Sequence, residues 1–251
     1  MKISTIAGWL TWRIAVNYRV APHVMREWIP APFRPKLIEG HALAGLDLIH
    51  QKNQRIAGLP KRMGITSYLA VHRVLVEWEE MGMRKTGMFI LRRDSSLGVH
   101  AWAGGRMYPG LFHRARFKAT HEEDAFSLRM RSRDHQTIAF EAQTTNRFPH
   151  YASFGQVNRV ASAIRAASSA YQARPDHHDI YEGVEWNINS WHPQPLRVTH
   201  LHASLFADMP KGSIFFDHAF LVADSPHQWI RLPEMIQSRP VDIPFGERFW
   251  V

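Results

Sequence analysis

Three neighbouring stretches of the chain alternate apolar and polar residues, and only very short loops separate them. They run from Phe112 to Ala119, from Phe126 to Arg133 and from Thr137 to Gln143. Because successive side chains of a strand face opposite sides, this alternation predicts three half-buried β-strands. Loops this short join antiparallel neighbours. The sequence therefore predicts a three-stranded antiparallel meander with which the rest of the fold must be compatible.

The segment directly before this meander concentrates turn-forming residues next to titratable ones. Gly104 to Gly110 contains three glycines and a proline, which predict a sharp bend or a close backbone contact. On the strand that follows, alternation places His113 on the apolar face with Ala115 and Phe117, whereas Arg114 points to the opposite side. We therefore expect the functional site of the protein to lie at this turn.

The remainder of the chain is also dominated by strand patterns. Glu39-Gly40 predicts a hairpin turn, and the further strands are expected at Trp9 to Tyr18, Lys36 to Gln51 (two strands), Thr66 to Trp78, Met88 to Arg93, Val99 to Ala103, Tyr181 to Ser190, Leu196 to Phe206 and Ser213 to Val222. Two helices are predicted, a short one between Pro22 and Pro30 and a longest one from Phe154 to Tyr171. The expected fold is mainly β: a large antiparallel sheet curled into a barrel or cone around a central cavity, with two peripheral helices.

Length and composition fit one such domain over residues 1–251. The hydrophobic content of 45% allows a sizeable core, and the absence of cysteine excludes disulfides and thiolate metal sites. The sequence has no long uncharged apolar run of the kind that predicts a membrane span, and its N-terminal segment lacks the pattern of a signal peptide. We therefore expect a cytoplasmic protein with no membrane partner.

The charge of the chain is strongly basic and unevenly distributed. The formal net charge is +9, and only seven of the 31 cationic residues are lysines. Between Arg84 and Arg133, eleven lysines or arginines stand against four acids. Guanidinium groups bind carboxylates and phosphates through paired hydrogen bonds, so a small anionic ligand is the expected partner. A nucleic acid is the weaker alternative.

Four segments, in order along nearly the whole chain, resemble acetoacetate decarboxylase-like proteins. They are Asn17 to Phe33, Tyr108 to Arg116, Trp191 to Leu196 and Phe216 to Ala219. The similarity is greatest to the DUF2071 (YqjF-like) branch of that superfamily. The resemblance implies an antiparallel β-cone whose interior pocket holds a small carbonyl or carboxylate compound.

The same resemblance identifies candidate site residues and one departure. In the parent decarboxylase a Gly-Arg pattern precedes two adjacent lysines, the first of which forms a Schiff base; here Gly105-Arg106 precedes His113-Arg114. An imidazole cannot form the iminium that a primary amine forms, so Schiff-base decarboxylation is not expected. His113 becomes the catalytic candidate. The substrate-binding candidates are Arg114, Arg106, Tyr68, Asp47 and His218, of which Asp47 and Tyr68 lie near the positions of the parent's acids and His218 belongs to a matching Asp-His pair.

Two of these candidates also have a purely structural interpretation. His113 would be a general base whose imidazole pKa is lowered by Arg114, or a half-buried histidine bonded to a backbone carbonyl. Arg114 would clamp a substrate carboxylate, or form a surface ion pair with an acid of the segment Glu122 to Asp124. The sequence leaves both choices open.

Neither a cofactor nor a metal is expected. His200 and His202 face one side of a strand, and His192 or His218 could complete a three-histidine set, but sixteen histidines meet such spacings by chance. We predict a small-molecule protein that binds an anionic carbonyl or carboxylate compound and that, if it is an enzyme, transforms this compound by acid/base chemistry of the lyase or hydrolase type. The alternatives are a non-enzymatic ligand-binding or regulatory domain and nucleic-acid binding through the basic meander; a homo-oligomer is left open.

Overall fold

Strands dominate the chain. The computed structural model describes residues 2–147, 157–174, 176–177 and 179–236. Their fourteen strands are β1 (Thr5–Val20), β2 (Arg34–Pro35), β3 (Leu37–Ile38), β4 (His41–Ile56), β5 (Ile65–Glu80), β6 (Met83–Ser95), β7 (His113–Glu122), β8 (Ala125–Ser132), β9 (Thr137–Thr144), β10 (Ser169–Ala173), β11 (Ile180–Ile188), β12 (Gln194–Ala203), β13 (Ile214–Arg231) and β14 (Met235–Ile236). The helices are α1 (Pro22–Trp28), α2 (Gly98–Ala103), α3 (Val157–Ala166) and α4 (Ser204–Ala207), with a 3₁₀ turn at Lys61–Met63.

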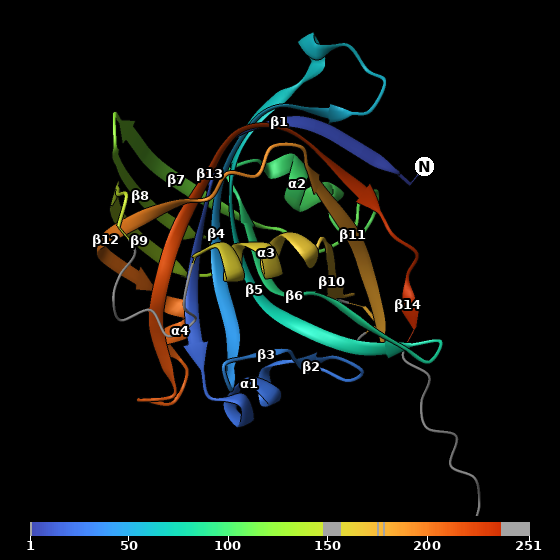
Figure 1. The fold of residues 1–251 in the computed structure, drawn as a ribbon. Coiled ribbons are helices and arrows are strands. Elements are labelled where there is room, and N and C mark those ends of the chain that lie inside the picture. Colours follow the sequence, from blue (N-terminus) through green and yellow to red (C-terminus); the bar gives the residue numbers. More distant parts are fainter. Residues whose placement is uncertain (1, 148–156, 175, 178, 237–251) are drawn as a thin grey trace, which may run out of the picture.

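All of these strands belong to one sheet that curls into a ring. Strands β13, β1, β4, β5, β6, β10 and β11 pair with one another in that cyclic order, because β11 also pairs with β13. The meander β7-β8-β9 and β12 form a second path from β6 back to β13, outside the ring. Helix α3 lies against the inner side of the ring (Figure 1).

This topology produces two hydrophobic cores that share a wall. Ile14 and Val16 of β1 pack toward the meander, whereas Ala15, between them in sequence, packs inside the ring against α3. A strand with a core on each side buries both of its faces, so its sequence is a nearly continuous apolar run. Charged residues within such a run are costly to bury and must be paired.

The predicted mainly β fold with a cone-like sheet is confirmed, and the three strands of the meander lie within a few residues of their predicted bounds. The turn at Glu39 and Gly40 is also present, with φ values of 48° and 78°. Two pairings are parallel, β6 with β7 and β6 with β10. Residues 96–112, which include α2, connect β6 to β7 and are long enough for the crossover that a parallel pair needs.

The helices differ from the prediction: the described residues form four rather than two, and α3 lies inside the ring rather than at its periphery. Two further elements also differ. Residues 99–103, expected as a strand, belong to helix α2, because a short apolar run does not distinguish the two structures. The predicted long helix ends at Ala166, and Tyr171 lies in β10, where pairing with β6 and β11 overrides the helical spacing. The start of that predicted helix, 154–156, lies outside the described residues. Within these, α3 is the longest helix, as predicted.

Candidate functional site

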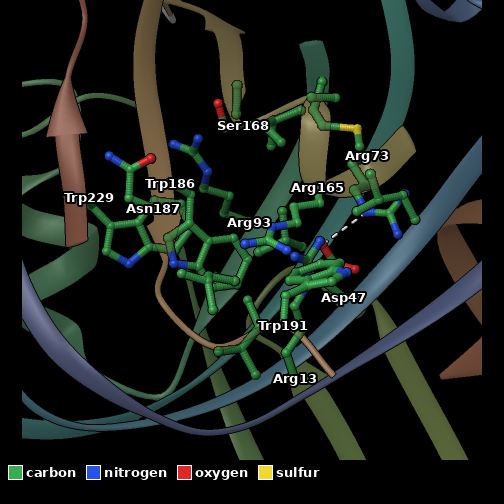
Figure 2. A pocket seen from close by; sticks show the side chains of 18 residues that line it. Arg13, Asp47, Arg73, Arg93, Arg165, Ser168, Trp186, Asn187, Trp191 and Trp229 are labelled. Atoms are coloured by element: carbon green, nitrogen blue, oxygen red, sulfur yellow. Dashed lines mark hydrogen bonds and ion pairs between the residues drawn. The ribbon is translucent and has the colours of Figure 1, made fainter. Parts of the chain in front are cut away.

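A cavity of about 280 Å³ lies inside the ring, between the sheet and the C-terminal end of α3 (Figure 2). Three sets of side chains form its wall. An ionic cluster from β1, β4 and β5 lies on one side, tryptophans from β11, β13 and the loop after β11 lie on another, and aliphatic residues of β5, β6 and α3 complete the wall. The cavity is therefore a polar recess in an otherwise apolar core.

The ionic cluster consists of Arg13, Asp47 and Arg73. Both guanidinium groups donate to the same carboxylate oxygen, Oδ2 of Asp47, at 2.6 Å from Arg13 Nη2 and 2.9 Å from Arg73 Nε. The three residues are only 4%, 3% and 1% exposed, respectively. Burial opposes ionisation of the Asp47 carboxyl, but attraction to the two arginines outweighs it, so its pKa lies below the usual value. Asp47 thus carries one negative charge between two positively charged arginines and cannot neutralise both of them.

The strand register brings these residues together. Asn17 of β1, Gly45 of β4 and Arg73 of β5 are neighbours across the sheet. A side chain at position 45 would begin 2.5 Å from Arg73 Nη1, so only glycine lets the guanidinium lie across β4. Arg73 Nη2 thereby reaches Asn17 Oδ1 at 3.0 Å while its Nε binds Asp47.

The cavity carries an unbalanced positive charge. Its wall includes four arginines and one aspartate, a net charge of +3. Arg93 is buried and Arg165 is exposed at the rim. Within the described residues, Arg13 Nε, Arg73 Nη1 and Asp47 Oδ1 are buried and have no hydrogen-bond partner. An uncompensated positive charge beside a cavity favours an anionic ligand there.

Tryptophans line the cavity next to the ionic cluster. Trp186 and Trp229 stack with ring centroids 4.3 Å apart, and the Arg13 guanidinium carbon lies 4.5 Å from the Trp186 ring centroid. The indole nitrogen of Trp186 donates to His227 Nδ1 at 3.1 Å. Burial lowers the pKa of His227 to about 4, so the ring is neutral and can accept this bond. The cavity therefore has a rigid aromatic wall beside its cations.

The ionic cluster continues toward β13 through hydrogen bonds. The Asn17 amide nitrogen lies 3.1 Å from His218 Nε2, and His218 Nδ1 lies 2.7 Å from Asp217 Oδ2. Donation from Nδ1 to the carboxylate leaves Nε2 to accept from the Asn17 amide, which fixes the neutral tautomer. A β-bulge at Asp217 lets these adjacent residues interact, which the alternation rule alone does not predict. His218 thus lies behind Asn17 and supports the cluster from its far side.

The predicted turn at Gly104 to Gly110 contributes to the cavity indirectly. Arg93 Nη1 donates to the carbonyl of Pro109 at 3.2 Å, and a side chain at Gly110 would overlap the Arg93 guanidinium. Burial is the main reason that the pKa of Arg93 is lowered, to about 10. The turn therefore positions a cation of the wall.

His113 and Arg114 lie elsewhere. His113 is half-buried at the edge of the meander, 3.6 Å from Asp134 Oδ2, and lines neither this cavity nor the apolar one described below. Its pKa is lowered, chiefly by burial and also by Arg92 rather than Arg114. Arg114 is exposed and lines a surface depression together with Arg116. The catalytic and clamping roles of this pair stay predictions.

Of the other predicted binding residues, only Asp47 lines the cavity. Arg106 is exposed and donates to the carbonyl of Trp102 at 2.9 Å. Tyr68 stacks on His50, with ring centroids 4.4 Å apart, on the meander side of the sheet. His218 reaches the cluster only through Asn17.

Six residues of the cavity wall are not among the predicted site residues: Arg13, Arg73, Arg93, Trp186, Trp191 and Trp229. One signal was available for two of them: Arg13 and Arg73 are isolated cations within long apolar strands, where burial demands a partner. That Asp47 is the partner depends on register between strands far apart in sequence, which no local pattern contains.

No metal centre is evident in the part of the chain that the structure describes, since no three histidine, aspartate or glutamate side chains gather as metal ligands there. None of the described cavity residues is a lysine. No helix in the described ranges is long and apolar enough to cross a bilayer.

Comparison with known proteins identifies the fold. No protein-family model matches the sequence, and no curated protein is similar enough in sequence to match. Acetoacetate decarboxylase from Legionella pneumophila superposes with a TM-score of 0.64 at 10% identity, covering 93% of this chain and 90% of that one. The enduracididine biosynthesis enzyme MppR complexed with pyruvate gives 0.56 at 12% identity, covering 95% and 91%. An acetoacetate decarboxylase-like enzyme from Sphingomonas wittichii gives 0.54 at 12% identity, covering 93% and 94%. The chain therefore has the acetoacetate decarboxylase-like fold.

Proposed function

We propose that this protein binds a small organic anion, a carbonyl or carboxylate compound, in the cavity beside Asp47. The observation that carries the proposal is the pair Arg13 and Arg73, which both donate to one oxygen of a single buried carboxylate and retain unused donors. A second carboxylate in the cavity would balance the positive charge that Asp47 leaves uncompensated. The solved structure of a protein of this fold with pyruvate is consistent with a ligand of this size and charge.

The geometry favours binding over turnover. Acid/base catalysis needs a group whose pKa lies near the working pH, whereas the pKa of Asp47 is lowered and the other titratable groups of the wall are arginines. Without a lysine among the described cavity residues, the Schiff-base route also lacks its nucleophile. We therefore propose a ligand-binding or regulatory role as the main function. Catalysis by His113, and membership of the DUF2071 (YqjF-like) branch, stay predictions.

Isothermal titration calorimetry with pyruvate and acetoacetate tests the proposal on two single variants. Arg13→Met leaves Asp47 paired with Arg73, so the protein should still fold. Losing a charge-assisted contact worth about 2–3 kcal/mol should weaken binding roughly a hundredfold. Arg114→Ala is the matched control, because Arg114 lies outside the cavity. If Arg114→Ala weakens binding and Arg13→Met does not, the site is on the meander and the proposal is wrong.

A further inference from the structure

A second cavity of about 270 Å³ adjoins the first and has a different character. Val71, Arg93 and Trp229 line both cavities. Beyond them the second wall is largely aliphatic and aromatic, with residues from β1, β4, β5, α2 and the turn that follows α2. Each cavity alone is slightly smaller than the usual 300–1,000 Å³ or so of ligand pockets, and together they fall within that range.

The second cavity offers little to a charged group. Arg55 and Arg93 are its only charged residues within the described ranges. His100 contacts Ser95 Oγ through Nδ1, and burial lowers its pKa to about 4, so its ring is uncharged near neutral pH. Arg93 is bound to the Pro109 carbonyl, and its guanidinium carbon lies 5.4 Å from the Phe112 ring centroid. A charged group of a ligand therefore finds its partners in the first cavity, whereas an apolar group fits the second cavity.

The rim of the second cavity exposes apolar side chains to solvent. Met63 and Val99 are 56% and 50% exposed, and Leu59 and Ile65 are 38% and 39% exposed. A cluster of exposed apolar residues around a hollow indicates a site that an apolar group covers. Because this hollow adjoins a cavity with excess positive charge, an occupant that fits both has an anionic end and an apolar end.

We propose that the two cavities form one site for an amphipathic carboxylic acid. Its carboxylate binds Arg13 and Arg73, and its aliphatic chain passes Val71, Arg93 and Trp229 into the second cavity. This inference rests on the proposed function and adds the ligand class: a monocarboxylic acid with an apolar tail rather than a short keto acid alone.

Calorimetry with straight-chain carboxylates from acetate to decanoate tests the inference. Once the chain reaches the second cavity, each further buried methylene should tighten binding about fourfold, until the cavity is full. Decanol, which has the tail without the carboxylate, should bind at least tenfold more weakly than decanoate. Affinity that does not change with chain length would overturn the inference.

A variant pair separates this inference from the proposed function. Ala103→Phe places a ring in the second cavity and should abolish the gain with chain length while pyruvate and acetate bind as before. Ala101→Phe, on the same helix but outside the cavity wall, is the control and should bind decanoate like the parent. If Ala103→Phe binds decanoate like the parent, the inference fails although the proposed function stands. A different outcome would rule out both the inference and the proposed function: Arg13→Met binds acetate and decanoate like the parent, and decanol binds as tightly as decanoate.

Discussion

At the scale of single residues, the described cavity wall contains four arginines and no lysine. An iminium forms only with a primary amine, and an arginine side chain cannot supply one. We therefore expect that sodium borohydride in the presence of acetoacetate or pyruvate leaves the mass of the intact protein unchanged. An adduct that peptide mapping locates on a lysine would show that Schiff-base chemistry persists in this chain.

Buried neutral histidines make the stability of the fold sensitive to acid. His72 is 1% exposed, and burial, with a smaller effect of Arg92, lowers its pKa to about 3 from the usual 6.5. The unfolded chain takes up a proton below pH 6.5 that folded His72 does not accept. Stability therefore falls as the pH decreases from about 6.5 to about 3, by up to roughly 1.4 kcal/mol per pH unit for this group.

His72→Phe should reduce that slope, because the aromatic replacement keeps the contact with Phe206 but does not titrate. The measurement is the free energy of unfolding in urea at several pH values between 6.5 and 4. The slope, rather than the absolute stability, is the readout, since a larger ring also alters packing. An unchanged slope in the variant would contradict the lowered pKa of His72.

At the scale of elements, α3 closes the inner side of the ring and also forms part of the cavity wall. Ile164 is 3% exposed, belongs to the inner core and lines the cavity. Ile164→Ala should destabilise the protein by about 2–5 kcal/mol, as expected when a large buried aliphatic side chain is truncated. Urea unfolding checks this. Ser162→Ala, on the exposed side of α3, should stay within about 0.5 kcal/mol of the parent; equal losses in both variants would mean that α3 does not pack as described.

Elements with a clear local pattern could be predicted from the sequence, and the site could not. Phe126 to Arg133 alternates strictly and is β8 within one residue. Tyr171 continues a helical pattern of apolar residues in the sequence. It nevertheless lies in strand β10, because β10 pairs with both β6 and β11 and so closes the ring between them. Arg13 and Asp47 meet only through the register of β1 with β4. Local propensity contains no information on that register. Asp47 became a candidate only through the family resemblance, and the apolar surroundings of Arg13 and Arg73 in the sequence signal that each needs a partner without naming it.

At the scale of the whole molecule, the basic meander presents a ridge of cations to solvent. The register places Arg116 opposite Arg131 and Lys118 opposite Arg129, all exposed. The apolar face of the same strands packs on the core outside the ring, so the cationic face does not line the central cavity. Like charges directly opposite one another are unfavourable, and counterions or an anionic polymer relieve the repulsion.

This ridge should bind nucleic acid only weakly and without sequence preference. Fluorescence anisotropy with a labelled oligonucleotide should give a dissociation constant of about 1 μM or weaker near 150 mM salt, and the affinity should fall steeply between 50 and 200 mM, since each neutralised phosphate releases counterions. The double variant Arg116→Ser and Arg131→Ser should reduce the salt dependence, whereas Arg13→Met should not. Nanomolar binding at 150 mM salt would instead support nucleic-acid recognition as the main function.

A crystal structure with a bound carboxylate would show directly whether the anion lies in the cavity beside Asp47. We suggest 4-bromobenzoate, because the bromine can be located by anomalous scattering. We expect the carboxylate beside Arg13 and Arg73, with the bromophenyl ring directed past Arg93 and Trp229 into the apolar cavity. A carboxylate bound instead at His113 and Arg114, with the ring interior unchanged, would contradict it.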